Sequence, residues 1–367
     1  MADLSITVNG IEFPNPFMVG SGPPGTNARV IRNAYDAGWG GAVAKTVSLE
    51  SHKVKNVSPR FGKLKSRKTG EVIGFENIEL ISDRPIETWI KEFAEIKKSH
   101  PKNVLIASIM EEYKKEAWQE LTKMVQDTGV DGIELNLSCP HGMPERKMGA
   151  AMGEHPDLVE EVTEWSKSVA TIPVWSKMTP NITHITQPAL AAVKGGADGI
   201  SAINTILSVI GVNLDTFAPM PTVEGHSVPG GYSCQAVRPI ALRQVMELAR
   251  ALPKETSICG IGGIECSEDA IQFLLLGAST LQVCTAVMLQ GHGIVKEMCE
   301  GLSTWMDKHK FEKLEDVVGK SLEYFTTHAN LVERQKAAKI AKAGQSNRDN
   351  EWAEKKFTDV TADLTAE

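Results

Sequence analysis

The 367-residue sequence lacks several features that would each have indicated a class of protein. None of its six cysteines forms a CxxC pair, so the spacing offers neither a zinc site nor an iron–sulfur site, and we expect no metal. No run of eighteen apolar residues occurs, which predicts no membrane-spanning helix. No GxGxxG follows the first strand-like segment, which argues against a dinucleotide site of the Rossmann type.

Basic residues are also fewer than acidic residues. The chain has 39 basic and 46 acidic residues, which gives a formal net charge of -7. Bulk attraction to nucleic acid or to an anionic membrane is therefore not expected. The first residues, MADLSITVNG, have no feature of a signal or transit peptide. We expect a soluble, cytoplasmic protein, and a plastid location stays open if a transit segment precedes this sequence.

Eight short segments are apolar almost throughout, as in strands that are buried on both faces of a parallel sheet. They are residues 17–22, 41–47, 104–110, 132–138, 174–179, 199–204, 257–263 and 281–286. Helical spacing of apolar residues occurs between them, at 114–129, 157–170, 184–196, 238–252 and 267–276. An open doubly wound sheet would also alternate in this way, but usually with fewer strands. The pattern therefore favours the α/β class and a closed (β/α)8 TIM barrel.

Further segments flank and interrupt this repeat. Residues 4–17 alternate around Asn9-Gly10 and predict an N-terminal β-hairpin. Residues 295–343 predict a C-terminal helical extension, so a single domain would cover 1–343 and a polar tail would cover 344–367. Long connections at 48–84, 139–156 and 205–237 are expected to build the active-site face of the barrel.

Polar residues end several of the predicted strands, where a barrel holds its catalytic groups. They are Ser21, Lys45, Asn136, Cys139, Lys177, Asn204 and Thr205. A lysine in a buried apolar strand needs a negatively charged partner. One alternative is a structural ion pair with a barrel carboxylate such as Glu134. The other, favoured because two lysines would face one barrel mouth, is an anionic ligand such as a reduced flavin.

Cys139 begins the loop of the segment NLSCPHGMPERKMG (136–149). A lone cysteine is usually a small core residue, but a position at the barrel mouth favours a general acid. Gly142, Gly149 and Gly153 suggest a mobile lid rather than a packed connection. Gly262-Gly263 and Cys284-Thr285 end two later strands, where barrels often bind phosphate. The basic stretch 53–68 is most simply explained as a solvated loop.

Several motifs together identify a family. They are AKTVSL (44–49), ENIELISD (76–83), IASIM (106–110), ELNLSCPHGMPERKMG (134–149), KMTPNIT (177–183), SAINT (201–205), PGGYS (229–233), RPIALR (238–243) and LQVCTAV (281–287). Over nearly the whole chain, the sequence resembles the dihydropyrimidine dehydrogenases in their short plant-type form. These are class 1 dihydroorotate-dehydrogenase-like FMN barrels, and the resemblance implies reduction of uracil and thymine to their 5,6-dihydro forms. It also implies NADPH as the ultimate electron source.

The resemblance assigns roles to individual positions. Cys139 matches the catalytic acid, which would protonate C5 after hydride transfer from FMN N5 to C6. The substrate positions are Asn77, Asn136, Leu137, Ser138, Asn204 and Thr205. The FMN positions are Ser21, Lys45, Thr46, Lys177, Gly262, Gly263, Cys284 and Thr285. One departure is Cys234, where multidomain members have a glycine near the FMN phosphate. Asparagine amides offer both a donor and an acceptor, which suits the uracil edge.

Three other functions share some of these features. Dihydroorotate dehydrogenases share Lys45, the NLSC motif and FMN, but they typically show an NxMGLPN-like loop in place of ENIELISD and CPN in place of Cys139-Pro140-His141. A flavoenzyme that reduces tRNA uridines would need a basic face. A flavoprotein that only binds or transfers electrons would not need Cys139 on a loop at the barrel mouth.

The electron donor and the assembly are less explicit in the sequence. NADPH could bind directly at the barrel mouth, with its 2′-phosphate held by the basic loop that contains Lys63, Lys65, Arg67 and Lys68. A separate FAD protein or ferredoxin is the alternative donor. The direct route is favoured, because the chain offers no iron–sulfur relay. A homodimer is expected, with apolar helix surface supplied by 295–343.

Overall fold

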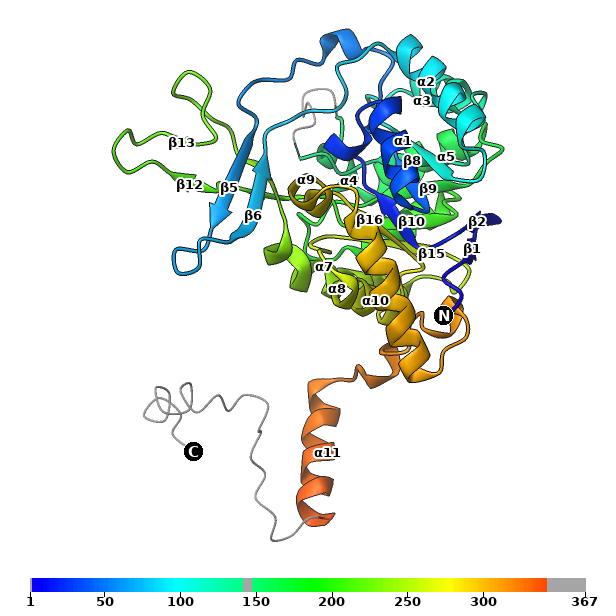
Figure 1. The fold of residues 1–367 in the computed structure, drawn as a ribbon, viewed down its shortest axis with the longest axis vertical. Helices are drawn as coiled ribbons and strands as arrows, with labels where there is room; N and C mark the ends of the chain where they lie inside the picture. Colours follow the sequence, from blue (N-terminus) through cyan, green and yellow to red (C-terminus); the bar gives the residue numbers. More distant parts are fainter. Residues whose placement is uncertain (1, 141–146, 342–367) are drawn as a thin grey trace. The chain divides into compact units, whose positions relative to one another are not determined.

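The computed structural model describes residues 2–140 and 147–341, and within them eight parallel strands close into a barrel (Figure 1). The strands follow one another around the barrel in chain order, and the last pairs with the first. They are β3 (Phe17–Val19), β4 (Gly41–Val43), β7 (Val104–Ile109), β8 (Gly132–Asn136), β9 (Val174–Lys177), β10 (Gly199–Ala202), β15 (Ser257–Ile261) and β16 (Thr280–Val283). The (β/α)8 prediction is confirmed. Seven of the predicted segments contain their strand, and β16 begins one residue before its predicted segment, 281–286.

Helices connect consecutive barrel strands. They are α1 (Ala28–Ala37), α2 (Ile86–Ser99), α3 (Lys115–Gln126), α4 (Ala150–Gly153), α5 (Pro156–Lys167), α6 (Thr186–Lys194), α7 (Arg238–Ala251) and α8 (Ser267–Leu275). The first of them shows why the sequence folds in this way. The Asn27 side chain accepts a hydrogen bond from the Val30 N–H and caps the start, and Gly38 ends the helix at φ 113°. Ile31 and Ala34 are fully buried, so one face packs on the barrel.

Seven of the eight barrel strands are buried along their whole length, as their apolar sequences predict, and β15 is half-buried at both ends. All six residues of β7 are buried, and so are all five of β8. Each fully buried aliphatic side chain contributes about 1.5–3 kcal/mol to folding, so this core carries most of the stability. Before the first barrel strand in the sequence, β1 (Ile6–Val8) and β2 (Ile11–Phe13) form the predicted hairpin. Asn9 and Gly10 both have positive φ, as a type I′ turn requires.

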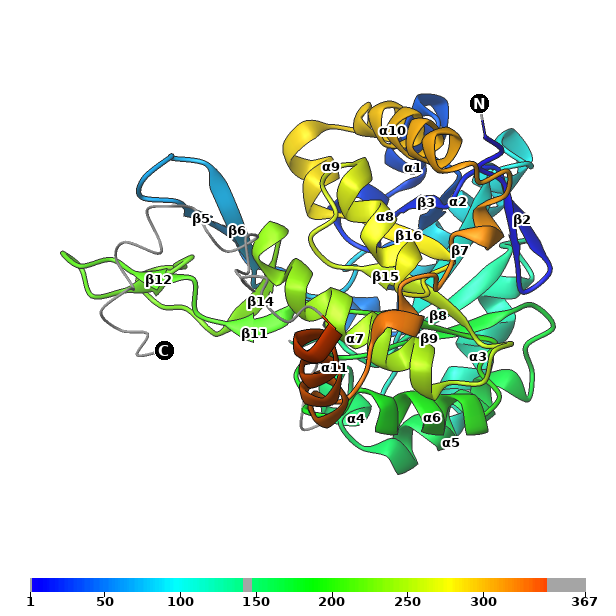
Figure 2. The ribbon, with the colours of Figure 1, turned by 90° about the horizontal axis from the view of Figure 1, so that it is seen from below.

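Two of the long connections pair with each other, which the sequence did not indicate. The connection after β4 contributes β5 (Phe61–Lys65) and β6 (Val72–Asn77), and the connection after β10 contributes β11 (Ile206–Ser208) and β14 (Gly230–Ser233). Together they form an antiparallel sheet in the order β11-β14-β6-β5. A short hairpin, β12 (Gly211–Val212) and β13 (Pro219–Met220), lies beyond it. These strands project from one side of the barrel (Figures 1 and 2).

The barrel belongs to a compact unit that spans residues 1–322. After β16 this unit continues with α9 (Thr285–Gln290) and α10 (Ile294–His309). The second unit spans 323–367, and its described part contains α11 (His328–Ala341). The predicted polar tail, 344–367, lies outside the described residues. No helix in the described part of the chain is long and apolar enough to cross a membrane.

Candidate active site

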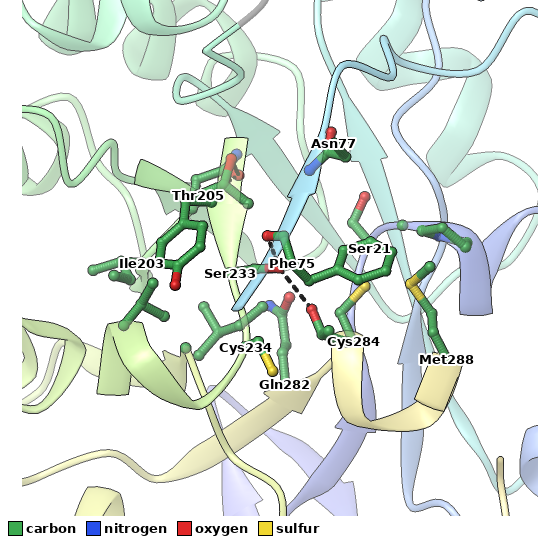
Figure 3. Close-up of a pocket in the computed structure, with 18 of the residues that line it drawn as sticks. Ser21, Phe75, Asn77, Ile203, Thr205, Ser233, Cys234, Gln282, Cys284 and Met288 are labelled. Atoms are coloured by element: carbon green, nitrogen blue, oxygen red, sulfur yellow. Dashed lines mark hydrogen bonds between the residues drawn. The ribbon is translucent and has the colours of Figure 1, made fainter. Parts of the chain in front are cut away.

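A cavity opens at the mouth of the barrel, where the carboxyl ends of the strands meet the four-stranded sheet. It encloses about 1070 Å³ of empty space, its open side included. This size is in the range of cofactor and small-molecule sites, and the location is the usual one for barrel enzymes. Figure 3 shows Asn77 and Thr205 on one side of the cavity and Gln282 and Cys284 on the other.

The structure brings nearly all of the predicted site residues together. The lining includes Ser21, Lys45, Thr46, Asn77, Asn136, Cys139, Lys177, Asn204, Thr205, Gly262, Gly263, Cys284 and Thr285. Leu137 and Ser138 are fully buried and are not part of the lining. Leu137 packs in the hydrophobic core, whereas the Ser138 hydroxyl accepts a hydrogen bond from the Asn204 side chain at 2.9 Å. Ser138 therefore orients a lining residue.

The amide side chains are held in fixed orientations by hydroxyl groups. Asn136 Nδ2 donates to Thr46 Oγ1 at 2.9 Å, and Thr46 Oγ1 lies 2.8 Å from Ser108 Oγ. The Asn204 Oδ1 atom accepts the backbone N–H of Thr205 at 2.7 Å. Asn77, at the end of β6, donates to the Gly231 carbonyl at 3.2 Å. Amides fixed in this way present defined donors and acceptors to a ligand.

Cys139 lines the cavity and also belongs to a small apolar cluster. The residue is only 7% exposed, and the cluster includes Val54, Ile81, Met110 and Met148. Its backbone carbonyl accepts the Ala150 N–H at 3.0 Å. Cys139 thus lines the same cavity as the amides and is shielded from bulk water, which suits proton delivery to a bound molecule.

The glycines after Cys139 serve close packing, at least where the structure describes them. A Cβ atom at Gly153 would lie 1.7 Å from the Leu137 carbonyl oxygen, and one at Gly149 would lie 2.5 Å from that of Cys139. No side chain fits at either position. Close packing therefore explains why both residues are glycine, and the mobile lid stays a prediction. Gly142 lies outside the described residues.

Both candidate lysines have buried carboxylate partners. Lys177 Nζ lies 3.2 Å from Glu134 Oε1 and donates to Gln282 Oε1 at 3.1 Å, while Gln282 Nε2 donates to Glu134 Oε2 at 2.6 Å. Lys177 thus makes the Glu134 ion pair that the sequence left open as an alternative. The charge of Lys177 on its own is therefore weak support for an anionic ligand.

Lys45 pairs with a residue that sequence reasoning missed. Its Nζ atom lies 2.8 Å from Glu79 Oε2, and Arg60 Nη1 lies 3.3 Å from Glu79 Oε1. Glu79 is only 8% exposed and lines the cavity two residues after Asn77. The available signal was an acidic residue in an otherwise apolar run, NIELI. Gln282, in the apolar strand β16, was missed in the same way.

Glycine backbone and hydroxyl groups line another side of the cavity. Gly262 and Gly263 follow β15 with φ of 135° and 75°, and a Cβ at Gly263 would lie 2.8 Å from the Cys234 carbonyl oxygen. Ser233 Oγ lies 2.8 Å from Thr285 Oγ1, the contact drawn in Figure 3. Such a surface of small groups and hydroxyls allows the close approach of a phosphate or ribityl group.

Cys234 adopts a backbone conformation that glycine takes most easily, with φ 81° and ψ -174°. This geometry gives a physical reason for a glycine at the matching position of the multidomain enzymes. The Cys234 thiol donates to Glu265 Oε1 at 3.1 Å, and burial raises the pKa of this thiol to about 12. Burial likewise raises the pKa of Cys284 to about 11, so both thiols are neutral at physiological pH.

Comparison with known proteins decides the family. The protein-family model described as dihydroorotate dehydrogenase matches residues 3–306 of this chain. The chain belongs to the dihydroorotate dehydrogenase family. It is 53% identical to the Arabidopsis thaliana dihydropyrimidine dehydrogenase (NADP(+)), chloroplastic, over 99% of this chain and 88% of that protein. It is 46% identical to the Escherichia coli NAD-dependent dihydropyrimidine dehydrogenase subunit PreA, over 86% of this chain and 76% of the subunit.

Other members are less similar. The catalytic subunit of Pyrococcus abyssi dihydroorotate dehydrogenase B (NAD(+)) is 35% identical over 87% of this chain and 99% of its own length. The solved structure of Eimeria tenella DHODH in complex with ferulenol matches with a TM-score of 0.72 at 18% identity, over 87% of this chain and 88% of that one. This likeness supports the barrel fold. Family membership makes the chain an oxidoreductase, with a flavin cofactor and a small-molecule substrate.

Proposed function

We propose that this family member is an FMN-dependent dihydropyrimidine dehydrogenase that reduces uracil and thymine to 5,6-dihydrouracil and 5,6-dihydrothymine. The observation that carries the proposal is that three amides, those of Asn77, Asn136 and Asn204, line the same cavity as Cys139. Amides match the alternating carbonyl and N–H groups of a neutral pyrimidine. The 53% identity to the Arabidopsis enzyme supports the same substrates.

The remaining surface of the cavity fits FMN. Hydroxyl groups in the lining come from Ser21, Thr46, Ser233 and Thr285. The Gly262-Gly263 turn brings backbone close to the cavity, and Lys177 lines the cavity with its hydrogen-bond partner Gln282. Apolar surface comes from residues such as Ile203, Ile261 and Val283. When bound, FMN would accept a hydride from the donor and supply a hydride to C6 of the pyrimidine.

The protein's own part in the reaction is to orient the ring, exclude water and move one proton. The fixed amides of Asn136 and Asn204 would hold the pyrimidine, and Thr205 would add a hydroxyl. Cys139 would give its thiol proton to C5, so the product gains one hydride and one proton. The apolar cluster around Cys139 would keep water away from this transfer.

The substrate is tested by anaerobic reduction of the bound flavin with dithionite, followed by mixing with uracil, thymine or orotate. The expected result is fast reoxidation of the flavin by uracil and thymine and slow reoxidation by orotate. Faster reoxidation by orotate would favour dihydroorotate dehydrogenase activity instead. Unmodified tRNA serves as a third oxidant, and rapid reaction with it would favour a tRNA-reducing enzyme.

For the donor, we propose that NADPH binds directly at the mouth of the barrel. Phe75 and Ser233 line the cavity and face each other across β6 and β14, and Lys63 faces Phe75 across β5 and β6. Side chains opposite each other share a face of a sheet, with Cβ atoms about 5 Å apart. Lys65 is two residues further along β5, with a register irregularity between them. Both lysines are exposed, and neither forms an ion pair with another described side chain.

Lys63 and Lys65 would therefore meet the phosphates of a dinucleotide whose nicotinamide ring enters the cavity. The changes Lys63→Gln and Lys65→Gln should each raise the Kd for NADPH in anaerobic flavin reduction by ~3–10-fold, and affect NADH less. Lys55→Gln removes the same charge outside the sheet and serves as the control. If NADPH alone leaves the flavin oxidised, a separate donor protein is required. Reduction with an unchanged Kd would keep NADPH but reject this site.

A homodimer and a cytoplasmic or plastid location stay predictions. The described part of the chain exposes large apolar side chains mainly on the projecting segment 206–228, where Leu214 and Phe217 are both 81% exposed. This segment is a better candidate for self-association than the predicted 295–343. Light scattering at micromolar concentration that gave a particle of 39.9 kDa would reject the dimer.

A further inference from the structure

Glu79 joins the barrel to the four-stranded sheet at the edge of the cavity. Its side chain is 6% exposed, and its two oxygen atoms bind different cations, Lys45 at 2.8 Å and Arg60 at 3.3 Å. Lys45 follows the barrel strand β4, whereas Arg60 directly precedes β5. The Glu79 carboxylate therefore forms ion pairs with both Lys45 and Arg60, so neither cation is free of a carboxylate partner.

The charges on the cavity wall balance. Among the described lining residues, Lys45 and Lys177 are the cations, and Glu79 and Glu265 are the carboxylates. Lys45 is paired with Glu79, and Lys177 is paired with Glu134, which lies behind the wall. Glu265 accepts the Cys234 thiol. An anionic ligand would find no cation on this wall without a carboxylate partner.

We propose that Glu79 makes this site select neutral pyrimidines over pyrimidine carboxylates, a specificity that rests on the proposed function. A neutral ring can lie beside the Glu79 carboxylate and the Asn77 amide without an opposing charge. A ring that carries a carboxylate would be repelled by Glu79 and could not use Lys45 or Arg60, because Glu79 already holds them. Rejection by repulsion is a common source of specificity between otherwise similar ligands.

The test compares two variants with opposite expected effects. Glu79→Gln keeps the side-chain shape but releases Lys45 and Arg60, so the ratio of the reoxidation rate constants for uracil and orotate should fall ~10–100-fold. Arg60→Gln removes a positive charge at a partly exposed position, so the same ratio should rise. Binding of orotate to the oxidised holoenzyme, measured by calorimetry, should strengthen in Glu79→Gln and weaken in Arg60→Gln.

Two controls make the result specific. Glu247→Gln makes the same chemical change in an ion pair with Arg243, outside the cavity lining, and should leave the ratio unaltered. Glu79→Asp keeps the charge and should restore most of the discrimination. An unchanged ratio in both Glu79→Gln and Arg60→Gln, with FMN bound, would overturn the assignment while leaving uracil reduction intact. Should the wild-type protein itself prefer orotate, the proposed function fails, and this inference fails with it. Arg60→Gln decides the question if Glu79→Gln does not fold.

Discussion

Two lysine–glutamate pairs lie near the same cavity, and they differ in what surrounds them. Lys177 and Glu134 come from the adjacent barrel strands β9 and β8, and their side chains are 5% and 1% exposed. Lys45 and Glu79 connect the barrel to the inserted sheet, and their pair continues to Arg60, which is 39% exposed. The inner pair is closed off by Gln282, whereas the outer pair ends at solvent.

The same two residue types can therefore serve different purposes in one protein. A buried pair on neighbouring strands loses most of its hydration, and removal of one partner leaves a charge with no compensation. A pair at the cavity edge can instead set the charge that a ligand meets. The inner pair should therefore matter for folding and the outer pair for substrate choice.

The largest expected effect is on turnover, which depends on the proton donor at the cavity. Cys139→Ala removes the proposed proton donor, so turnover with uracil should fall by ~10²–10⁴-fold. Flavin content should remain that of the wild type, because other lining residues are proposed to hold FMN. Steady-state assays and flavin absorbance measure the two quantities. Cys266→Ala, at an exposed cysteine outside the cavity, is the matched control, and equal rates in both variants would remove Cys139 from the mechanism.

The next effect concerns the inner pair. Glu134→Gln leaves Lys177 buried with no carboxylate, and the free energy of unfolding should fall by about 3–5 kcal/mol. Urea unfolding of the holoenzyme measures this quantity. Glu79→Gln is the comparison variant and should cost less, because Lys45 and Arg60 lie closer to solvent. A loss below about 1 kcal/mol in Glu134→Gln would erase the proposed difference between the two pairs.

The smallest effect is a pH dependence in the inner region. Gln282 Nε2 lies 3.5 Å from Cys259 Sγ, and burial raises the pKa of this thiol to about 11 from 9.0. The folded state therefore favours the neutral thiol, and its contribution is present below pH 9 and is lost as pH rises toward 11. Between pH 8 and 10 the loss should be about 1 kcal/mol. Unfolding of Cys259→Val should show a flatter profile over this range, and parallel profiles would contradict the assignment.

Sequence patterns were enough to predict the barrel. Its eight strands could be predicted without knowledge of long-range contacts, because a strand that is buried on both faces is apolar throughout. The hairpin at Asn9-Gly10 was predictable because its turn requires positive φ at two consecutive residues. The four-stranded sheet was not predictable, since β6 and β14, the strands that join its two halves, belong to connections more than a hundred residues apart.

The site was predictable to the extent that its residues end barrel strands or belong to recognised motifs. Asn136, Lys177 and Asn204 are examples, and the barrel topology brings them together. What a single sequence could not show was which carboxylate each lysine meets. Glu134 is one strand away from Lys177, but Glu79 approaches Lys45 from the inserted sheet. Pairing across such an insertion depends on tertiary structure alone.

Reduction of the 5,6 double bond of a neutral pyrimidine is the reaction that we propose for the enzyme at this cavity. The most direct measurement is the amount of product formed in a single turnover, with the flavin reduced beforehand and oxygen excluded. After mixing with excess uracil, the account predicts one equivalent of 5,6-dihydrouracil per flavin, and little dihydroorotate when orotate is used instead. Stoichiometric dihydroorotate, with no dihydrouracil from uracil, would contradict it.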